Sequence, residues 1–207
     1  MHYPNGKNFE GKRDQAKSRP GPKTKKVQFG QRGMRLENML NQSNQWYLNR
    51  GLAVIHKKPT PIQVVKVDYP KRARAKITEA YYRQASTTDY NGIYKGWYVD
   101  FEAKQSDRMQ SFPLNNIKDH QVKHMTACSQ AGGLSFVIFW FSKRQEAYLY
   151  PIEALLEDWR AYQDSERSSI PFQRIEDYAY PIALKYQPYL DYLPLIDQYI
   201  ADYGKSH

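Results

Sequence analysis

The sequence predicts an α/β fold, in which helices cover a β-sheet, from three observations. Residues 134–141, LSFVIFWF, form an uninterrupted apolar run, which is typical of a strand buried on both faces. Residues 87–104 combine a glycine-containing turn with the two-residue alternation of strands. Residues 30–50 place apolar side chains at helical spacing and are followed by a glycine. These segments indicate strands and helices that share one core.

The remaining elements are expected from capping residues, prolines and glycines, which begin or end helices and strands. In chain order they are a strand at 52–58, strands at 63–69 and 77–84, a helix at 117–131 capped by Asn115 or Asn116 and ended by Gly132, a strand at 146–150, a helix opening at Pro151, and a helix at 193–203 followed by Gly204.

Length and composition predict one folded domain. The chain has 207 residues, of which 41% are hydrophobic and 25% charged. The one cysteine, Cys128, excludes an internal disulfide and fits a reducing compartment; we expect it to be a small buried residue. No apolar run approaches the ~20 residues of a membrane span, and the N-terminus lacks the apolar core of a secretory signal. A cytoplasmic location is therefore expected.

The positive charge is concentrated in two segments. Net charge is +10, and residues 1–28 and 57–83 each hold eight Lys or Arg against two acidic residues, which leaves −2 for the rest of the chain. Such localised excess indicates a partner that is a polyanion, although a basic surface serving only solubility would give the same total. Residues 1–28 are expected to be a flexible basic arm, or a solvated tail without a role, ahead of one domain at 29–207.

An unusual feature within this domain is a pair of expected strands, 63–69 and 77–84, joined by the basic turn YPKRAR. Together they predict a protruding two-stranded ribbon with a positive tip. A ribbon of this width can enter a DNA groove about 12 Å wide. The alternative is an ordinary pair of sheet strands with a solvated turn.

The candidate chemistry lies in residues 87–104, TTDYNGIYKGWYVDFEAK. Strand alternation places Asp100, Glu102 and Lys104 on one face, and Asp89, 13 positions before Glu102 across the turn, can face it from the neighbouring strand. Two carboxylates this close repel unless a cation lies between them, and hard oxygen ligands suit Mg²⁺. Lys104 can then meet the charge that develops at a phosphodiester. The alternative is that Lys104 pairs with Glu102 or Asp100 on an exposed face, a contact worth under about 1 kcal/mol.

Four further residues are candidate ligands. Glu37 lies beside the apolar face of the first helix, where it is either a surface charge or a group that reaches the metal cluster from the flank. His120 and His124 are four apart on the predicted helix, a chelating spacing, but no third ligand accompanies them. Gln121 on the same helix could aim its amide towards the carboxylates.

Several blocks of the sequence resemble RecU, the Holliday junction resolvase family of Gram-positive bacteria. They are TTDYNGIYKGWYVDFEAK, YPNGK near the start, RGMRLE at 32–37, VIHKKPTPIQVVKVDYPKR at 54–72, FPLNNIKDHQVKHM at 112–125 and YQPYLDY at 186–192. The resemblance implies a restriction-endonuclease-like fold with a PD-(D/E)xK core: a mixed central sheet flanked by helices. The first motif here reads Thr88-Asp89, without the proline of the general pattern.

The resemblance also implies roles for particular residues. Thr87, Asp89, Glu102 and Gln121 match the family's magnesium positions, Mn²⁺ being an alternative ion, and Lys104 matches its transition-state lysine; Glu37 matches an acidic position on the first helix of the broader superfamily. The resemblance implies a symmetric homodimer too, in which the ribbon, inserted at about residues 60–83, forms a stalk over a DNA-binding cleft. The residues expected to contact phosphates are Lys57, Lys58, Lys71, Arg72, Arg74 and Lys76.

The function expected is therefore Mg²⁺-dependent resolution of four-way DNA junctions by symmetric paired nicks, in recombination, repair and chromosome segregation. Expected partners are junction DNA, a recombinase and a branch-migration helicase. The alternative is a non-catalytic junction-binding protein that modulates the recombinase and branch-migration proteins. A site-specific restriction enzyme is disfavoured because most of the positive charge lies in an arm and a stalk.

Overall fold

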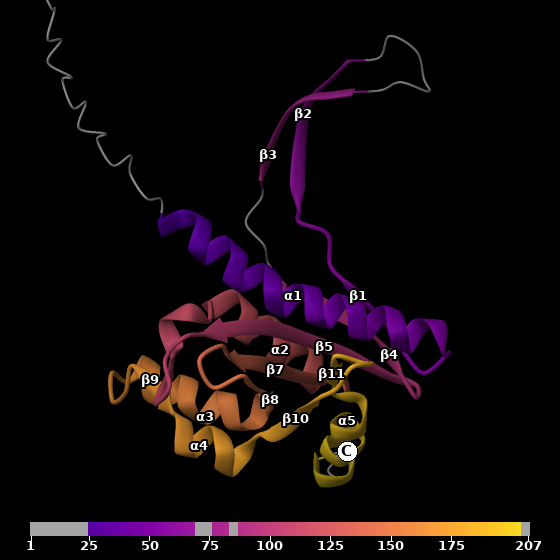
Figure 1. Cartoon of the computed structure of the whole chain (residues 1–207). Coiled ribbons are helices and arrows are strands. Elements are labelled where there is room, and N and C mark those ends of the chain that lie inside the picture. The colour runs from indigo at the N-terminus through magenta and orange to yellow at the C-terminus, as the bar shows by residue number, and fades with distance from the viewer. Residues whose placement is uncertain (1–24, 69–75, 83–86, 204–207) are drawn as a thin grey trace, which may run out of the picture.

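A seven-stranded mixed sheet forms the centre of the molecule, in the order β1-β4-β5-β7-β8-β10-β11 (Figure 1). The computed structural model describes residues 25–68, 76–82 and 87–203. The pair β5·β7 is parallel, and the other neighbours in this sheet are antiparallel. The strands of this sheet are β1 (Val54–Lys57), β4 (Tyr90–Tyr94), β5 (Trp97–Ser106), β7 (Leu134–Phe141), β8 (Glu146–Pro151), β10 (Tyr180–Leu184) and β11 (Leu190–Asp191).

Helices cover both faces of the sheet, so the expected mixed sheet flanked by helices is confirmed. One buried cluster joins one face to α1 (Lys25–Asn49) and α5 (Leu193–Tyr203). A second cluster joins the other face to α2 (Asp119–Gln130), α3 (Ile152–Gln163) and α4 (Phe172–Tyr178). A 3-10 turn, η2 (Leu114–Asn116), and a two-stranded sheet of β6 (Ser111–Pro113) and β9 (Ser169–Pro171) close this side.

The strand β7 is buried along its whole length, as its apolar run predicts. Its side chains alternate between the two clusters: Phe136 and Ile138 pack toward α1 and α5, whereas Val137 and Phe139 pack toward α2 and α3. Burial of this many large apolar side chains is the main favourable term in folding. The strand therefore serves as the centre of both layers.

The neighbouring strand β5 carries the candidate chemistry, and aromatic packing fixes it. The Phe101 ring lies 4.9 Å from the rings of both Tyr90 and Phe136 and is stacked on each. Because Phe101 points toward α1, strand alternation turns Asp100 and Glu102 toward α2. The two faces predicted for this strand are confirmed.

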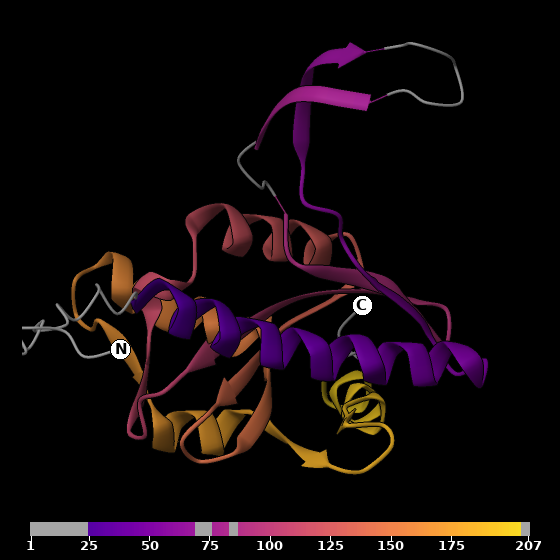
Figure 2. The ribbon, with the colours of Figure 1, turned by 45° about the horizontal axis from the view of Figure 1, so that its top comes forward.

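The predicted stalk is present as a separate two-stranded sheet of β2 (Ile62–Asp68) and β3 (Lys76–Tyr82). It projects away from the body, while α1 runs across the sheet below it, as Figure 2 shows. Several large apolar side chains on it are exposed: Ile62, Val64, Val65, Ile77 and Tyr81. The expected basic tip, with Lys71, Arg72 and Arg74, lies at 69–75, outside the described residues.

Two boundaries differ from expectation. Helix α1 begins at Lys25, so residues 25–28 of the predicted basic arm are helical, whereas residues 1–24 lie outside the described part of the chain. The prediction that Asn115 or Asn116 caps α2 is wrong: both lie in η2, and the extended, buried Ile117 separates that turn from α2, whose cap is Lys118. Among the described helices, none is both long and apolar enough to cross a membrane.

Candidate active site

Strand pairing brings Asp89 and Glu102 together. Tyr90 of β4 is opposite Phe101 of β5, so Asp89, one residue before β4, is level with Glu102. Asp89 Oδ2 also accepts a hydrogen bond of 3.4 Å from the backbone N–H of Ala103. Glu102 is 2% exposed. Its Oε1 lies 2.9 Å from Lys104 Nζ, and its Oε2 is buried without a hydrogen-bond partner in the described structure.

The electrostatics of Glu102 follow from this burial. Burial raises the pKa of Glu102 to about 8, the Lys104 ammonium opposes that rise, and the Asp89 carboxylate adds to it. A buried oxygen without a partner is costly, and a second carboxylate beside it makes the ionised form costlier. A divalent cation would relieve both costs, so this pair of carboxylates fits a metal such as Mg²⁺.

Lys104 is held against Glu102, one member of this pair. Its side chain is 16% exposed and ion-paired with Glu102. The expected alternative, that the two pair on an exposed face, is right about the pair and wrong about the face, because both side chains are largely buried and β5 lies between β4 and β7 in the sheet. The ammonium therefore lies beside the carboxylates in a largely desolvated place, where charges interact more strongly than in water.

A hollow on the α1 side of the sheet reaches Asp89 from the other direction. It is lined by Leu36, Glu37, Lys57, Asp89, Tyr90, Ala103 and Gln105. Glu37 Oε1 and Lys57 Nζ form an ion pair of 2.6 Å. Glu37 thus approaches Asp89 from the flank, in a pair with Lys57. Sequence reasoning missed Gln105, whose Oε1 is buried and unpartnered among the described residues, because alternation places it on the face opposite Glu102.

Thr87 and Gln121, the other expected magnesium positions, make different contacts. The Thr87 hydroxyl donates to the carbonyl of Thr88 at 3.4 Å. Gln121 is buried, and its Oε1 accepts the backbone N–H of Lys118 at 2.9 Å, which caps α2. Gln121 therefore already has a structural contact through one of its amide atoms.

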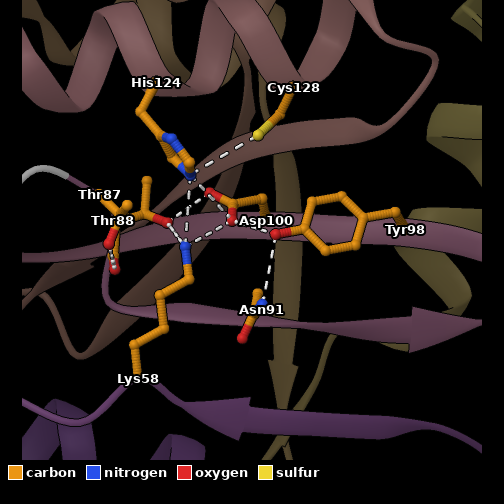
Figure 3. Close-up of polar contacts among 8 residues, drawn as sticks. All are labelled: Lys58, Thr87, Thr88, Asn91, Tyr98, Asp100, His124 and Cys128. Atoms are coloured by element: carbon orange, nitrogen blue, oxygen red, sulfur yellow. Dashed lines mark hydrogen bonds and ion pairs between the residues drawn. The ribbon is translucent and has the colours of Figure 1, made fainter.

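A second polar cluster surrounds Asp100, for which the sequence suggested no role (Figure 3). Asp100 is fully buried. Its carboxylate contacts Lys58 Nζ at 2.6 Å, the Tyr98 hydroxyl at 2.9 Å, His124 Nε2 at 3.3 Å, and the hydroxyl of Thr88. Burial alone would raise the pKa of Asp100, but the hydrogen bonds from Lys58 and Thr88, with the Lys58 charge, hold it below its usual value. We call Lys58, Thr88, Tyr98, Asp100 and His124 the Asp100 cluster.

This cluster changes how Lys58 and His124 are understood. Lys58 was expected to meet phosphates, but its ammonium is turned inward onto Asp100 and is 3.4 Å from His124 Nε2. The half-buried Cys128 lies 3.6 Å from the same nitrogen. Donor atoms of Asp100, His124 and Cys128 lie within 4.8 Å of one another. Because the Lys58 ammonium already sits against two of them, the cluster holds a lysine as its cation.

Two of the expected phosphate-contacting residues can be placed on the surface. Lys57 is half-exposed beside the hollow that reaches Asp89, and Lys76 is exposed at the start of β3. The stalk is inserted between β1 and β4, so the chain enters it shortly after Lys57 and leaves it shortly before Asp89.

Comparison with known proteins decides the family. The model of the family described as Recombination protein U matches residues 31–198. The chain belongs to the RecU family. A protein named Holliday junction resolvase RecU from Geobacillus kaustophilus is 48% identical over 197 residues, which cover 95% of this chain and 96% of the relative. The protein of that name from Streptococcus sanguinis is 52% identical over 172 residues, 83% of this chain and 85% of the relative.

The RecU resemblance expected from the sequence blocks is thus confirmed over nearly the whole chain. Among solved structures, Archaeoglobus fulgidus Hjc, described as a Holliday junction resolvase from an archaeal hyperthermophile, aligns at 13% identity with a TM-score of 0.42, covering 70% of this chain and 93% of that one. The RecU match at 31–198 spans most of α1, the stalk, Asp89, Glu102, Lys104 and part of α5.

Proposed function

We propose that this protein is a metal-dependent endonuclease that resolves Holliday junctions by symmetric paired nicks in DNA recombination, repair and chromosome segregation. The observation that carries the proposal is the carboxylate of Glu102 in a chain of the RecU family. Its Oε2 is buried near Asp89 without a hydrogen-bond partner among the described residues, and its Oε1 is paired with Lys104. The Geobacillus kaustophilus and Streptococcus sanguinis relatives are each named Holliday junction resolvase RecU.

The metal proposed is Mg²⁺, with Mn²⁺ as an alternative. Asp89 and Glu102 would hold it, and Thr87 and Gln121 are proposed to complete its ligands. Gln121 would bind through the second lone pair of its Oε1, or after this oxygen releases its contact with Lys118. When bound at a phosphodiester, such an ion supplies Lewis-acid activation and neutralises developing charge. Glu102 has a further role of its own, because its Oε1 orients the Lys104 ammonium.

Lys104 is proposed to stabilise the negative charge that grows on the scissile phosphate. Its ammonium is fixed by Glu102 before substrate binds, so little reorganisation is needed at the moment of reaction. On the other side of Asp89, Lys57 can contact the DNA backbone if it exchanges Glu37 for a phosphate. Glu37 is then a positioning group for Lys57 beside the metal site.

Junction recognition is proposed to come from the stalk. Lys71, Arg72 and Arg74 of its expected tip and the exposed Lys76 would contact phosphates, which gives salt-sensitive affinity with little sequence preference. A homodimer would bring one metal site to each of two symmetric strands. Lys58 is not proposed as a phosphate contact, since its ammonium is turned inward. A cytoplasmic location and partnership with a recombinase and a branch-migration helicase are part of the same proposal.

Cleavage of a synthetic four-way junction tests this proposal. The protein should nick the junction at paired, symmetric positions with Mg²⁺, leave it intact with EDTA, and leave a linear duplex of the same arm sequence largely uncut. The second candidate, a non-catalytic junction-binding protein, is favoured by the projecting stalk alone; it predicts tight junction binding and no nicks at any concentration of Mg²⁺ or Mn²⁺.

A further inference from the structure

Asp100 lies where the two ends of the stalk meet the body. Lys58 is the residue after β1, just before the chain enters β2, and Thr88 lies between β3 and β4. The Asp100 carboxylate contacts both of them, and Lys58 Nζ donates to the Thr88 hydroxyl at 2.9 Å (Figure 3). We call Lys58 and Thr87–Asp89 the stalk roots. One buried carboxylate therefore joins the entering root to the leaving root.

A backbone hydrogen bond connects the entering root directly to Asp89, a proposed metal ligand. The N–H of Lys58 donates to the carbonyl of Asp89 at 2.7 Å, beyond the last register pair of β1 and β4, Lys57 with Tyr90. Asp89 is thus held by the entering root through its backbone, while its neighbour Thr88 is held by Asp100. Displacement of either root would move the Asp89 carboxylate relative to Glu102.

The cluster also extends to α2. His124 Nε2 lies 3.3 Å from Asp100 Oδ2, and Gln121 lies one turn earlier on the same helix. Asp100 itself is two residues from Glu102 on β5. The Asp100 carboxylate therefore lies close to every proposed metal ligand along the chain. It contacts Thr88, which lies between Thr87 and Asp89; it contacts His124, one helical turn from Gln121; and it is two residues from Glu102.

The energetics favour a single arrangement of these elements. Asp100 is 0% exposed, so removal of any one donor would leave a buried charge short of a partner. Charge-assisted hydrogen bonds such as the one from Lys58 are about twice as strong as neutral ones. In the described part of the chain, the side-chain partners of Asp100 are Lys58, Thr88, Tyr98 and His124, none of which is a proposed metal ligand. The cluster already contains a lysine cation, so we assign it an action on geometry.

We propose that Asp100 is a positioning residue that locks both stalk roots onto the catalytic strand, so that Asp89 stays level with Glu102 only while the stalk keeps this orientation. DNA that engages the stalk therefore acts on the metal site through the roots. The catalytic consequence rests on the proposed function, whereas the lock itself does not.

The test compares Asp100→Asn with a matched control, Asp158→Asn. Asp158 is 1% exposed and, like Asp100, binds basic side chains and a tyrosine hydroxyl, here Arg167, Arg174 and Tyr150, but it lies on α3 away from the stalk roots. Both variants should lose stability. The first readout is hydrogen–deuterium exchange of peptides spanning residues 57–60 and 87–91 in the metal-free, DNA-free protein. Asp100→Asn should raise exchange there about tenfold or more, and Asp158→Asn should not.

The second readout is the Mg²⁺ concentration for half-maximal junction cleavage, with metal-free junction binding measured alongside. Asp100→Asn should raise that concentration about 10-fold or more, because residues that orient metal ligands typically affect metal affinity by that factor. Junction binding without metal should change by less than about threefold. Lys58→Met should act in the same direction, and the double variant should be no worse than the stronger single one, as expected for residues in one network.

Thr88→Val is the milder variant should Asp100→Asn fail to fold, since it removes one hydroxyl at nearly constant volume. It should shift both readouts in the same direction by about threefold, less than the effect of a charged partner. The proposal is overturned if Asp100→Asn loses as much stability as Asp158→Asn but leaves the hydrogen exchange of the stalk roots and the Mg²⁺ dependence of cleavage unchanged. If the unsubstituted protein cleaves no junction at all, the proposed function fails, and the exchange experiment still decides whether Asp100 locks the roots.

Discussion

Replacing Glu102 with glutamine should change how stability depends on pH in the metal-free protein. In the folded protein the pKa of Glu102 is about 8, above its ordinary value of 4.5, chiefly because the side chain is buried. Between these two values the folded protein keeps a proton that the unfolded chain releases. The free energy of unfolding therefore falls as pH rises through this window, and this loss is complete above the folded pKa.

The magnitude follows from the linkage of one proton. The slope for one group is about 1.4 kcal/mol per pH unit, so Glu102 alone would cost at most about 4 kcal/mol between pH 5 and pH 8. In Glu102→Gln this contribution is absent. The free energy of unfolding of the variant minus that of the wild type should therefore increase with pH across this range and level off near pH 9.

Urea denaturation in EDTA at pH 5, 6, 7, 8 and 9 measures this difference, at one fixed protein concentration because association also affects stability. Glu79→Gln, which removes a carboxylate from the exposed stalk, is the control and should follow the wild-type pH dependence. Saturating Mg²⁺ should stabilise the wild type most at pH 8 and above and should not stabilise Glu102→Gln. If the free energy of unfolding changes with pH in the same way in Glu102→Gln and in the wild type, the reasoning about Glu102 is refuted.

Other predictions concern the chemistry, the stalk and the core. Lys104→Met should lower single-turnover cleavage of a junction about 100-fold or more with little change in binding; a rate within about threefold of wild type would remove Lys104 from the mechanism. Alanine at Arg72, Arg74 and Lys76 together should weaken junction binding more than duplex binding in a salt titration, and equal losses would contradict the role of the stalk. Phe101→Ala should lower the free energy of unfolding by about 3–5 kcal/mol in urea, since Phe101 packs between two rings. Tyr186→Ala, at a side chain that is 90% exposed, should change the free energy of unfolding by less than about 0.5 kcal/mol.

Local patterns in the sequence were sufficient for much of the fold. The run at 134–141 predicts β7 with its observed bounds, and the last helix is found over its predicted residues, 193–203. Alternation along β5 correctly separates Phe101 from Asp100 and Glu102. Such features depend on neighbours within a few residues, which a sequence displays directly.

The parts that could not be predicted depend on distant residues. The partners of Asp100 come from positions 58, 88, 98 and 124, and no local pattern indicates that they meet. The same holds for the depth at which Glu102 is buried, because it depends on the parallel pairing of β5 with β7 and on α2. The capping role of Gln121 was missed for a related reason: Ile117 leaves the helical conformation, which moves the start of α2 to Asp119.

The most direct test of the central claim is Asp89→Asn, assayed for both cleavage and binding of a four-way junction. The substitution keeps the size of the side chain and removes the charge that, with Glu102, would hold the metal. We expect no detectable nicks with Mg²⁺, and junction affinity in EDTA within about threefold of the wild type because the stalk is unchanged. Cleavage by Asp89→Asn at the wild-type rate would contradict the assignment of the metal site to Asp89 and Glu102.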